Sequence, residues 1–66
     1  MNVQDIAKRV KRIKTQMKDP ENAHVLQDIL WYDVLAAIAN GTCEDPQECA
    51  KLASSVKNLE FPRWFA

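Results

Sequence analysis

The stretch 23–41 constrains this chain most, because it is apolar on almost every side of a helix. At 100° per residue its larger apolar side chains fall on three sides, represented by Val25 with Ile29, by Leu30 with Val34, and by Leu35 with Ile38. A helix of this kind needs neighbours around it. We therefore expect the other segments of the chain to pack against it.

The size of the chain limits how much of that surface it can cover alone. Its 66 residues make one domain, and a domain this small has a marginal core. Because 47% of the residues are hydrophobic, some apolar surface should remain after folding. This surplus predicts a homo-oligomer, in which copies share the central helix.

The first segment predicts a helix over about 3–18. Apolar residues recur there at spacings of three and four, the pattern of a helix seam: Val3, Ile6, Val10, Ile13 and Met17. Asn2 can cap its first turn. Asp19-Pro20 ends this helix, because a residue before proline leaves the α region, and the same pair starts the next one. The tight joint predicts a helical hairpin.

The central helix is expected over about 20–39, with Asn40-Gly41 as its C-cap. Asp45-Pro46 repeats the Asp-Pro pattern that starts the central helix, and Glu48 should complete a capping box with Asp45. The third helix should run over 46–57. The aromatic tail, 59–66, should be docked on the body. The predicted fold class is all-α, a compact three-helix single domain spanning 1–66.

Charge is divided unevenly along the chain. The formal net charge is 0, but residues 1–18 hold six bases and one acid, whereas residues 19–66 hold three bases and eight acids. The apolar stretch is interrupted by Gln27, Asp28 and Asp33, which argues against a membrane span, and the N-terminus lacks a signal-peptide pattern. With Cys43 and Cys49 interpreted as reduced thiols, we expect a cytoplasmic protein.

Catalytic chemistry is disfavoured by the residue inventory. The chain has one histidine, His24, and it lies four residues before Asp28, so the two can pair along one helix face. This pair could simply support the helix start, or it could contact a ligand. One histidine and scattered acids make neither a nucleophile–base pair nor a metal site. We expect no enzyme activity, no metal and no cofactor.

The basic first helix has three interpretations. Its cations, which include Arg9 and Arg12, could face solvent, match the acidic half of a neighbouring subunit, or bind a small anion such as a nucleotide. Duplex nucleic acid is disfavoured, because the protein is neutral overall with a pI near 6.5.

The C-terminal Arg63-Trp64 has two interpretations. Trp64 could fill the core while Arg63 forms an ion pair with Glu60 or with an acid of the second helix. Alternatively, the indole and guanidinium could stack on a purine and hold its phosphates. Tyr32 supplies another ring on the central helix.

Several of these residues form a pattern that resembles one in very short proteins of actinobacteria, other bacteria and their phages. The pattern reads A-H-x-x-E-D-x-L-x-x-x-V-L-x-x-I-A-x-G, then D-P-x-x-x-A, then F-x-R-W-x-A. Here it begins at Ala23-His24 and ends at Phe61, Arg63, Trp64 and Ala66. Gln27 stands where the pattern has an acid, and Phe65 where it often has Cys or Tyr.

The resemblance implies a phage or mobile-element origin, and with it a role in binding and blocking. Our leading hypothesis is a non-enzymatic counter-defence protein that sequesters a cyclic nucleotide or ADP-ribose-type signal at subunit interfaces in the host cytoplasm. Its ligand-binding residues would be Arg63, Trp64, His24, Asp28, Tyr32, Arg9 and Arg12. The alternatives are an inhibitor that binds a host defence protein and a small structural or DNA-associated helical module.

Overall fold

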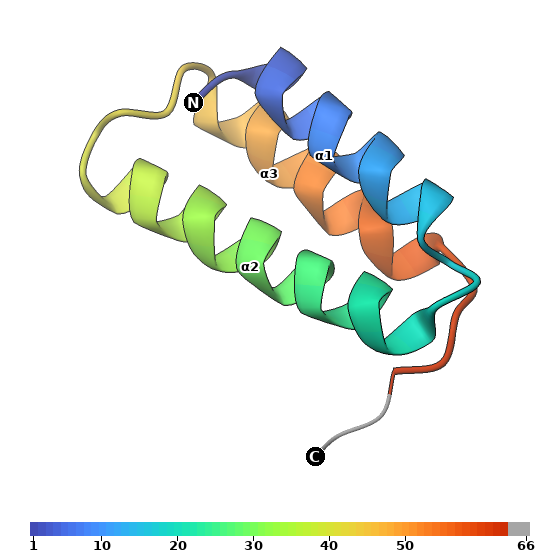
Figure 1. Ribbon diagram of the computed structural model, residues 1–66. Helices are drawn as coiled ribbons and strands as arrows, with labels where there is room; N and C mark the ends of the chain where they lie inside the picture. The colour runs from blue at the N-terminus through green and yellow to red at the C-terminus, as the bar shows by residue number, and fades with distance from the viewer. Residues whose placement is uncertain (64–66) are drawn as a thin grey trace.

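The computed structural model describes residues 1–63, and in this part of the chain it is all-α, as predicted. Three α-helices follow one another: α1 (Val3–Thr15), α2 (Pro20–Ala39) and α3 (Pro46–Ser54), with a 3₁₀ turn, η1 (Ser55–Asn58), at the end of α3. Figure 1 shows that α1 and α3 run in the same direction, with α2 antiparallel to both. The predicted hairpin of the first two helices is confirmed.

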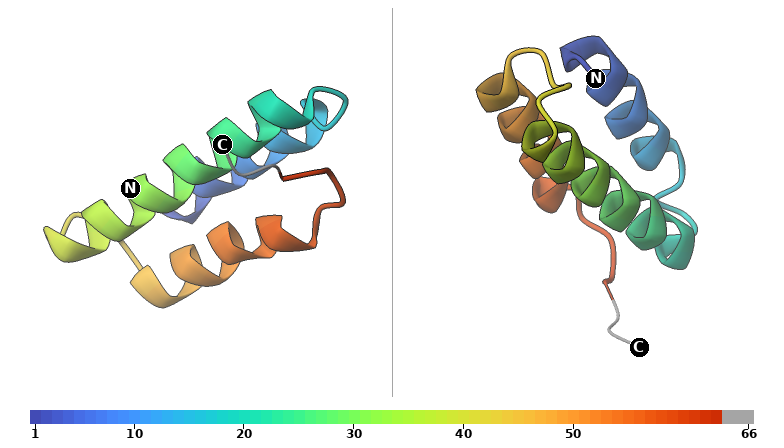
Figure 2. Two further views of the ribbon diagram at one scale, coloured as in Figure 1. Left: turned by 90° about the horizontal axis from the view of Figure 1, so that it is seen from below. Right: turned by 90° about the vertical axis from the view of Figure 1, so that its left-hand side faces the viewer.

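The core lies where the three helices meet, and each helix contacts both others. Ile6, Val10 and Ile13 of α1 are buried, as the seam predicted. From α2 the apolar stripe Ala23, Leu30 and Val34 enters the same cluster. The third contribution comes from α3, η1 and the segment after them: Cys49, Ala53, Val56 and Phe61. Figure 2 shows the three helices gathered around this centre in two further views.

The starts of α1 and α2 are capped as the sequence indicated. The Asn2 side chain accepts a hydrogen bond from the Asp5 amide at 2.9 Å, and the Asp5 carboxylate accepts one from the Asn2 amide at 3.0 Å. Asp19 accepts from the Asn22 amide at 3.3 Å, with Pro20 at the first helical position.

The end of α2 is a complete Schellman motif. Gly41 has a φ of 76°, and its amide donates to the Ile38 carbonyl at 3.3 Å. The Thr42 amide donates to the Ala37 carbonyl at 2.9 Å. The predicted C-cap at Asn40-Gly41 is confirmed.

The predicted capping box at the start of α3 is wrong. Asp45 has φ 52° and ψ 64°, which is left-handed backbone, and its side chain makes no cap hydrogen bond. A side-chain cap needs a residue with extended backbone, so the carboxylate cannot reach the helix amides. The first turn is held instead by the Asp45 carbonyl, which accepts from the Cys49 amide at 3.0 Å.

Two helix ends also differ from the prediction. The first helix ends at Thr15, not near 18, because Gln16 leaves helical geometry and a short turn leads into Asp19. The third α-helix ends at Ser54, and the chain continues as the tighter 3₁₀ turn η1 (Ser55–Asn58). In the tail, Leu59 and Phe61 pack on the core, which agrees with a docked segment as far as residue 63.

Candidate interaction groove

His24 and Asp28 form the pair that their spacing predicted. The His24 Nε2 lies 3.4 Å from the Asp28 Oδ2, and the Asp28 side chain is mostly exposed. Tyr32 follows one turn later on α2, with 71% of its surface exposed. These three predicted ligand-binding residues therefore lie along adjacent turns of one helix.

The two predicted cations, Arg9 and Arg12, lie on α1 and not on the helix that carries these three residues. Arg9 forms a salt bridge with Asp33 at 2.9 Å, which ties α1 to α2. Asp33 is five residues after Asp28, so the two carboxylates project about 140° apart around α2. Arg12 is exposed on α1. The structure does not bring Arg9 together with His24 and Asp28.

The partly buried Arg63 side chain forms hydrogen bonds to other groups of the protein. Its Nε donates to the Gln27 Oε1 at 2.7 Å, and its two terminal nitrogens donate to the backbone carbonyls of Val56 at 2.8 Å, Leu59 at 3.1 Å and Phe61 at 3.3 Å. The guanidinium carbon also lies 3.8 Å from the centre of the Phe61 ring. Among the described residues, a neutral amide thus replaces the predicted acid partner. Trp64 lies outside the described residues.

Gln27 is the polar residue that sequence reasoning did not assign to the core. It is 2% exposed, although it is a polar residue on the central helix. Its position carried a signal, because residue 27 is four after Ala23 and three before Leu30, on the buried stripe. A buried amide needs partners, and Arg63 supplies one.

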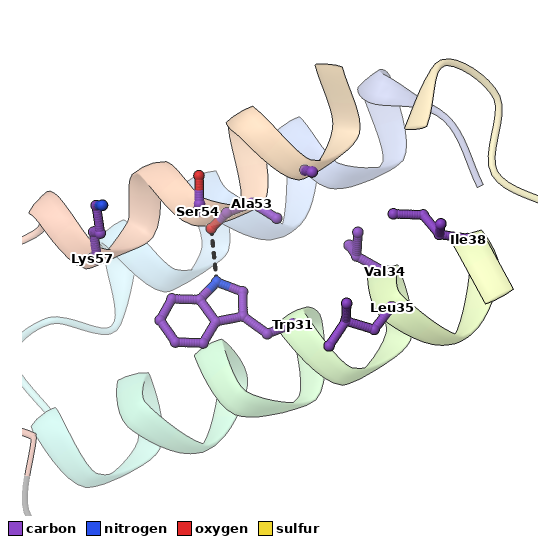
Figure 3. A pocket seen from close by; sticks show the side chains of 8 residues that line it. Trp31, Val34, Leu35, Ile38, Ala53, Ser54 and Lys57 are labelled. Atoms are coloured by element: carbon purple, nitrogen blue, oxygen red, sulfur yellow. Dashed lines mark hydrogen bonds between the residues drawn. The ribbon is translucent and has the colours of Figure 1, made fainter. Parts of the chain in front are cut away.

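An apolar groove of about 300 Å³ lies between α2 and α3. Figure 3 shows its side chains, which come from both helices and from η1: Trp31, Val34, Leu35, Ile38, Ala50, Ala53, Ser54 and Lys57. The indole nitrogen of Trp31 donates to the Ala53 carbonyl at 2.8 Å, so the ring bridges the two helices. Small residues on α3 leave the groove open, because they fill little of the space opposite α2.

A band of large apolar side chains continues from this groove and winds around the exposed side of α2, since Ile29 and Ile38 are separated by about 180° on the helix. We call it the apolar ridge, and its members are Val25, Ile29, Tyr32, Leu35 and Ile38, all exposed by more than a third. Leu35 is 67% exposed and lines the groove as well. The predicted surplus of apolar surface on the central helix is therefore present on the described chain.

The two cysteines lie near the start of α3. The Cys49 Sγ donates to the Glu44 carbonyl at 3.1 Å, and the Cys43 Sγ lies 3.7 Å from the same oxygen. Burial raises the pKa of Cys49 to about 11, with the neighbouring Cys43 and Asp45 adding to the effect. Cys49 is therefore a protonated core residue at neutral pH.

Within residues 1–63, no group of three or more His, Cys, Asp and Glu side chains is placed to hold a metal ion. No helix in this range has the length and apolar character needed to cross a membrane.

No protein-family model, curated protein or solved structure matches this chain. The candidate site therefore rests on the chain's own residues. The groove and the apolar ridge are the features of the described surface that combine depth with exposed apolar side chains.

Proposed function

We propose that this chain is a non-enzymatic protein-interaction module that docks an apolar helix in the groove between α2 and α3. The observation that carries the proposal is the continuity of the groove with the apolar ridge, which meet at Leu35 and Ile38. Grooves of this kind accept amphipathic helices through apolar side chains at i, i+3, i+4 and i+7. The chemistry of the lining supports this ligand class, since Lys57 is the single charged side chain among the described residues that line it.

Fluorescence anisotropy with a labelled amphipathic helical peptide tests this function. We expect saturable binding, and we expect Leu35→Arg to weaken it about tenfold or more, because the substitution places a charge in the groove. Lys14→Glu is the matched control, because Lys14 is exposed on α1 and does not line the groove. Equal binding by the parent and Leu35→Arg would contradict the proposal.

Sequestration of a nucleotide-like anion stays a prediction from the sequence, as does a counter-defence role. Tyr32, with its exposed ring, and the adjacent His24 and Asp28 are the residues of that hypothesis that share a surface. Phosphate binding by Arg63 would have to compete with its internal hydrogen bonds. A thermal-shift screen against cyclic di- and trinucleotides and ADP-ribose derivatives tests it: a ligand that stabilises the protein and is recovered intact after heating would support sequestration.

A further inference from the structure

The two cysteines of the chain meet at one backbone carbonyl at the start of α3. The Cys49 thiol donates to the Glu44 carbonyl oxygen at 3.1 Å, and the Cys43 thiol donates to the same oxygen at 3.7 Å. Burial is the main cause that raises the pKa of Cys49, and a side-chain hydrogen bond with Cys43 adds to it. The two sulfur atoms are therefore neighbours in the folded chain.

The loop holds Cys43 in this position through its backbone. The Met1 amino group donates to the Thr42 carbonyl at 3.0 Å, and the Met1 carbonyl accepts from the Glu44 amide at 2.8 Å, so the residues on both sides of Cys43 are anchored. Figure 1 shows the N-terminus beside the end of this loop. Asp45 then turns the chain into α3 with a φ of 52°, which residues other than glycine rarely adopt. The folded backbone thus keeps the Cys43 side chain next to the first turn of α3.

The two thiols differ in their access to solvent. Cys43 is partly exposed in the loop, whereas Cys49 is 0% exposed and belongs to the core. A small reagent from solvent therefore meets Cys43 first, and Cys49 is reached through Cys43. An accessible cysteine beside a second one that can displace its adduct is the arrangement found at redox-sensitive sites.

We propose that this pair is a redox-sensitive modification site, at which a low-molecular-weight disulfide such as oxidised glutathione links Cys43 to Cys49 within the folded chain. Neither cysteine lines the groove between α2 and α3, so the proposal is independent of the proposed function. The site differs from a structural disulfide, because both thiols are free in the structure and the bond forms only when the oxidant is supplied.

The reaction has two exchange steps. The Cys43 thiol gives its proton to solvent, its sulfur attacks one sulfur of oxidised glutathione, and one glutathione leaves as a thiolate that takes up a proton. The Cys49 thiol then gives its proton to solvent, its sulfur attacks the Cys43 sulfur, and the second glutathione leaves in the same way. Two protein thiols are oxidised by two electrons, and the reagent is reduced to two glutathione thiols.

The new bond should stabilise the folded chain. An S–S bond of about 2.05 Å is shorter than a contact between two thiols, so the loop residue Cys43 moves toward Cys49, which is fixed in the core. The Glu44 carbonyl loses both thiol donors, which are weak. Closing the loop 43–49 also restricts the unfolded chain, and this effect outweighs two weak hydrogen bonds. We therefore expect the oxidised chain to have a Tm several degrees above that of the reduced chain.

Mass spectrometry of the full 66-residue chain, incubated with oxidised glutathione and quenched with acid, tests the proposal. The parent should first carry one glutathione, mapped to Cys43 by peptide digestion, and should then lose it and become two hydrogens lighter than the reduced chain. Dithiothreitol should restore the original mass. Because protonation of Cys49 slows the second step, the Cys43 adduct should accumulate enough to be mapped.

Two variants separate the roles of the thiols. Cys49→Ala should stop at the Cys43 adduct. Cys43→Ala should be modified about tenfold more slowly or less in the folded state, and quickly once urea is added, because burial protects Cys49. Circular dichroism shows whether each variant is folded. If one is not, the time course and the mapped adduct of the parent still decide the outcome.

Four results would overturn the proposal. The first is a glutathione adduct on Cys43 of the parent that persists without conversion, and the second is a disulfide that forms only between chains. The third is equally fast modification of Cys49 in folded Cys43→Ala and of Cys43 in the parent. The fourth is an oxidised parent with a Tm below that of the reduced chain, because the site would then oppose the bond.

Discussion

At the residue scale, the structure assigns different roles to side chains that look alike in the sequence. The sequence groups Arg9, Arg12 and Arg63 as candidate anion ligands. Arg9 pairs with Asp33, Arg12 faces solvent, and Arg63 hydrogen-bonds Gln27 together with three carbonyls. Spacing along a helix could predict the His24–Asp28 pair, since both residues are local. It could not predict the contact between residues 27 and 63, which depends on where the tail returns.

We expect the Arg63 side chain to stabilise the folded protein. Arg63→Ala leaves the Gln27 amide oxygen and the Val56 carbonyl without this donor, so we expect a loss of about 2–3 kcal/mol in the free energy of unfolding. Urea denaturation followed by circular dichroism measures the loss. Arg12→Ala is the control, with an expected change under about 0.5 kcal/mol. Equal effects of the two substitutions would contradict the assigned role of Arg63.

Cys49 should make stability fall in alkaline solution. Its pKa rises from 9.0 to about 11 on folding, so between these values the unfolded chain loses the thiol proton first. The native state then holds more protons than the unfolded state, and the free energy of unfolding decreases as pH rises. The contribution is complete below the unfolded pKa of 9.0 and is lost as the pH rises toward about 11.

Urea denaturation under reducing conditions at three pH values, about 8, 9.5 and 10.5, measures this slope. Cys49→Ala should be less stable overall because it removes a buried side chain, but its decline in the alkaline range should be shallower than in the parent. Cys43→Ala should keep most of the slope. If the free energy of unfolding falls equally with rising pH in the parent and in Cys49→Ala, the Cys49 thiol is not the cause of the alkaline decline.

At the scale of the elements, the sequence predicted the helices well because their starts and ends are encoded locally. Asp19-Pro20 and Asn40-Gly41 carry the signals for α2 within a few residues. The start of α3 was predicted less well. There the loop 40–45 determines the backbone of Asp45, and the N-terminus takes part, since the Met1 carbonyl accepts from the Glu44 amide at 2.8 Å. A local sequence pattern cannot predict this contact, because Met1 and Glu44 lie far apart in the sequence.

The two left-handed residues of this loop should respond in opposite directions to substitution. Gly41→Ala places a Cβ on a φ of 76°, and although no atom lies within 4 Å of that position, the backbone conformation costs about 1 kcal/mol. Asp45→Gly relieves a φ of 52° and should gain about 0.5 kcal/mol. Thermal unfolding of both variants beside the parent measures the signs. A destabilised Asp45→Gly would show that its side chain supports the loop.

At the scale of the whole molecule, the apolar surplus was predictable and the groove was not. The sequence showed that the stretch 23–41 has more apolar faces than its neighbours can cover, and the exposed apolar ridge confirms that part. The groove exists because small residues of α3, such as Ala50 and Ala53, lie opposite Leu35 and Ile38. Which residues face one another across two helices depends on their packing, which periodicity within each helix does not determine.

The homo-oligomer predicted from the sequence should make the melting temperature depend on protein concentration. Because association stabilises only the folded chain, raising the concentration about a hundredfold, from micromolar to submillimolar, should increase the Tm by several degrees in the parent. Leu35→Arg should show a Tm independent of concentration over the same range. Scanning calorimetry with a matched Lys14→Glu control checks this, and a constant parent Tm would indicate a monomer.

The position of Trp31 gives the molecule an intrinsic optical signal. Its indole spans the two walls of the groove through the bond to Ala53, so any helix that enters must change the solvation of the ring. With Trp64 replaced by Phe, the emission should shift to shorter wavelength as the groove fills, and it should stay red-shifted in Leu35→Arg. Occupancy could then be followed on a stopped-flow timescale without any attached dye.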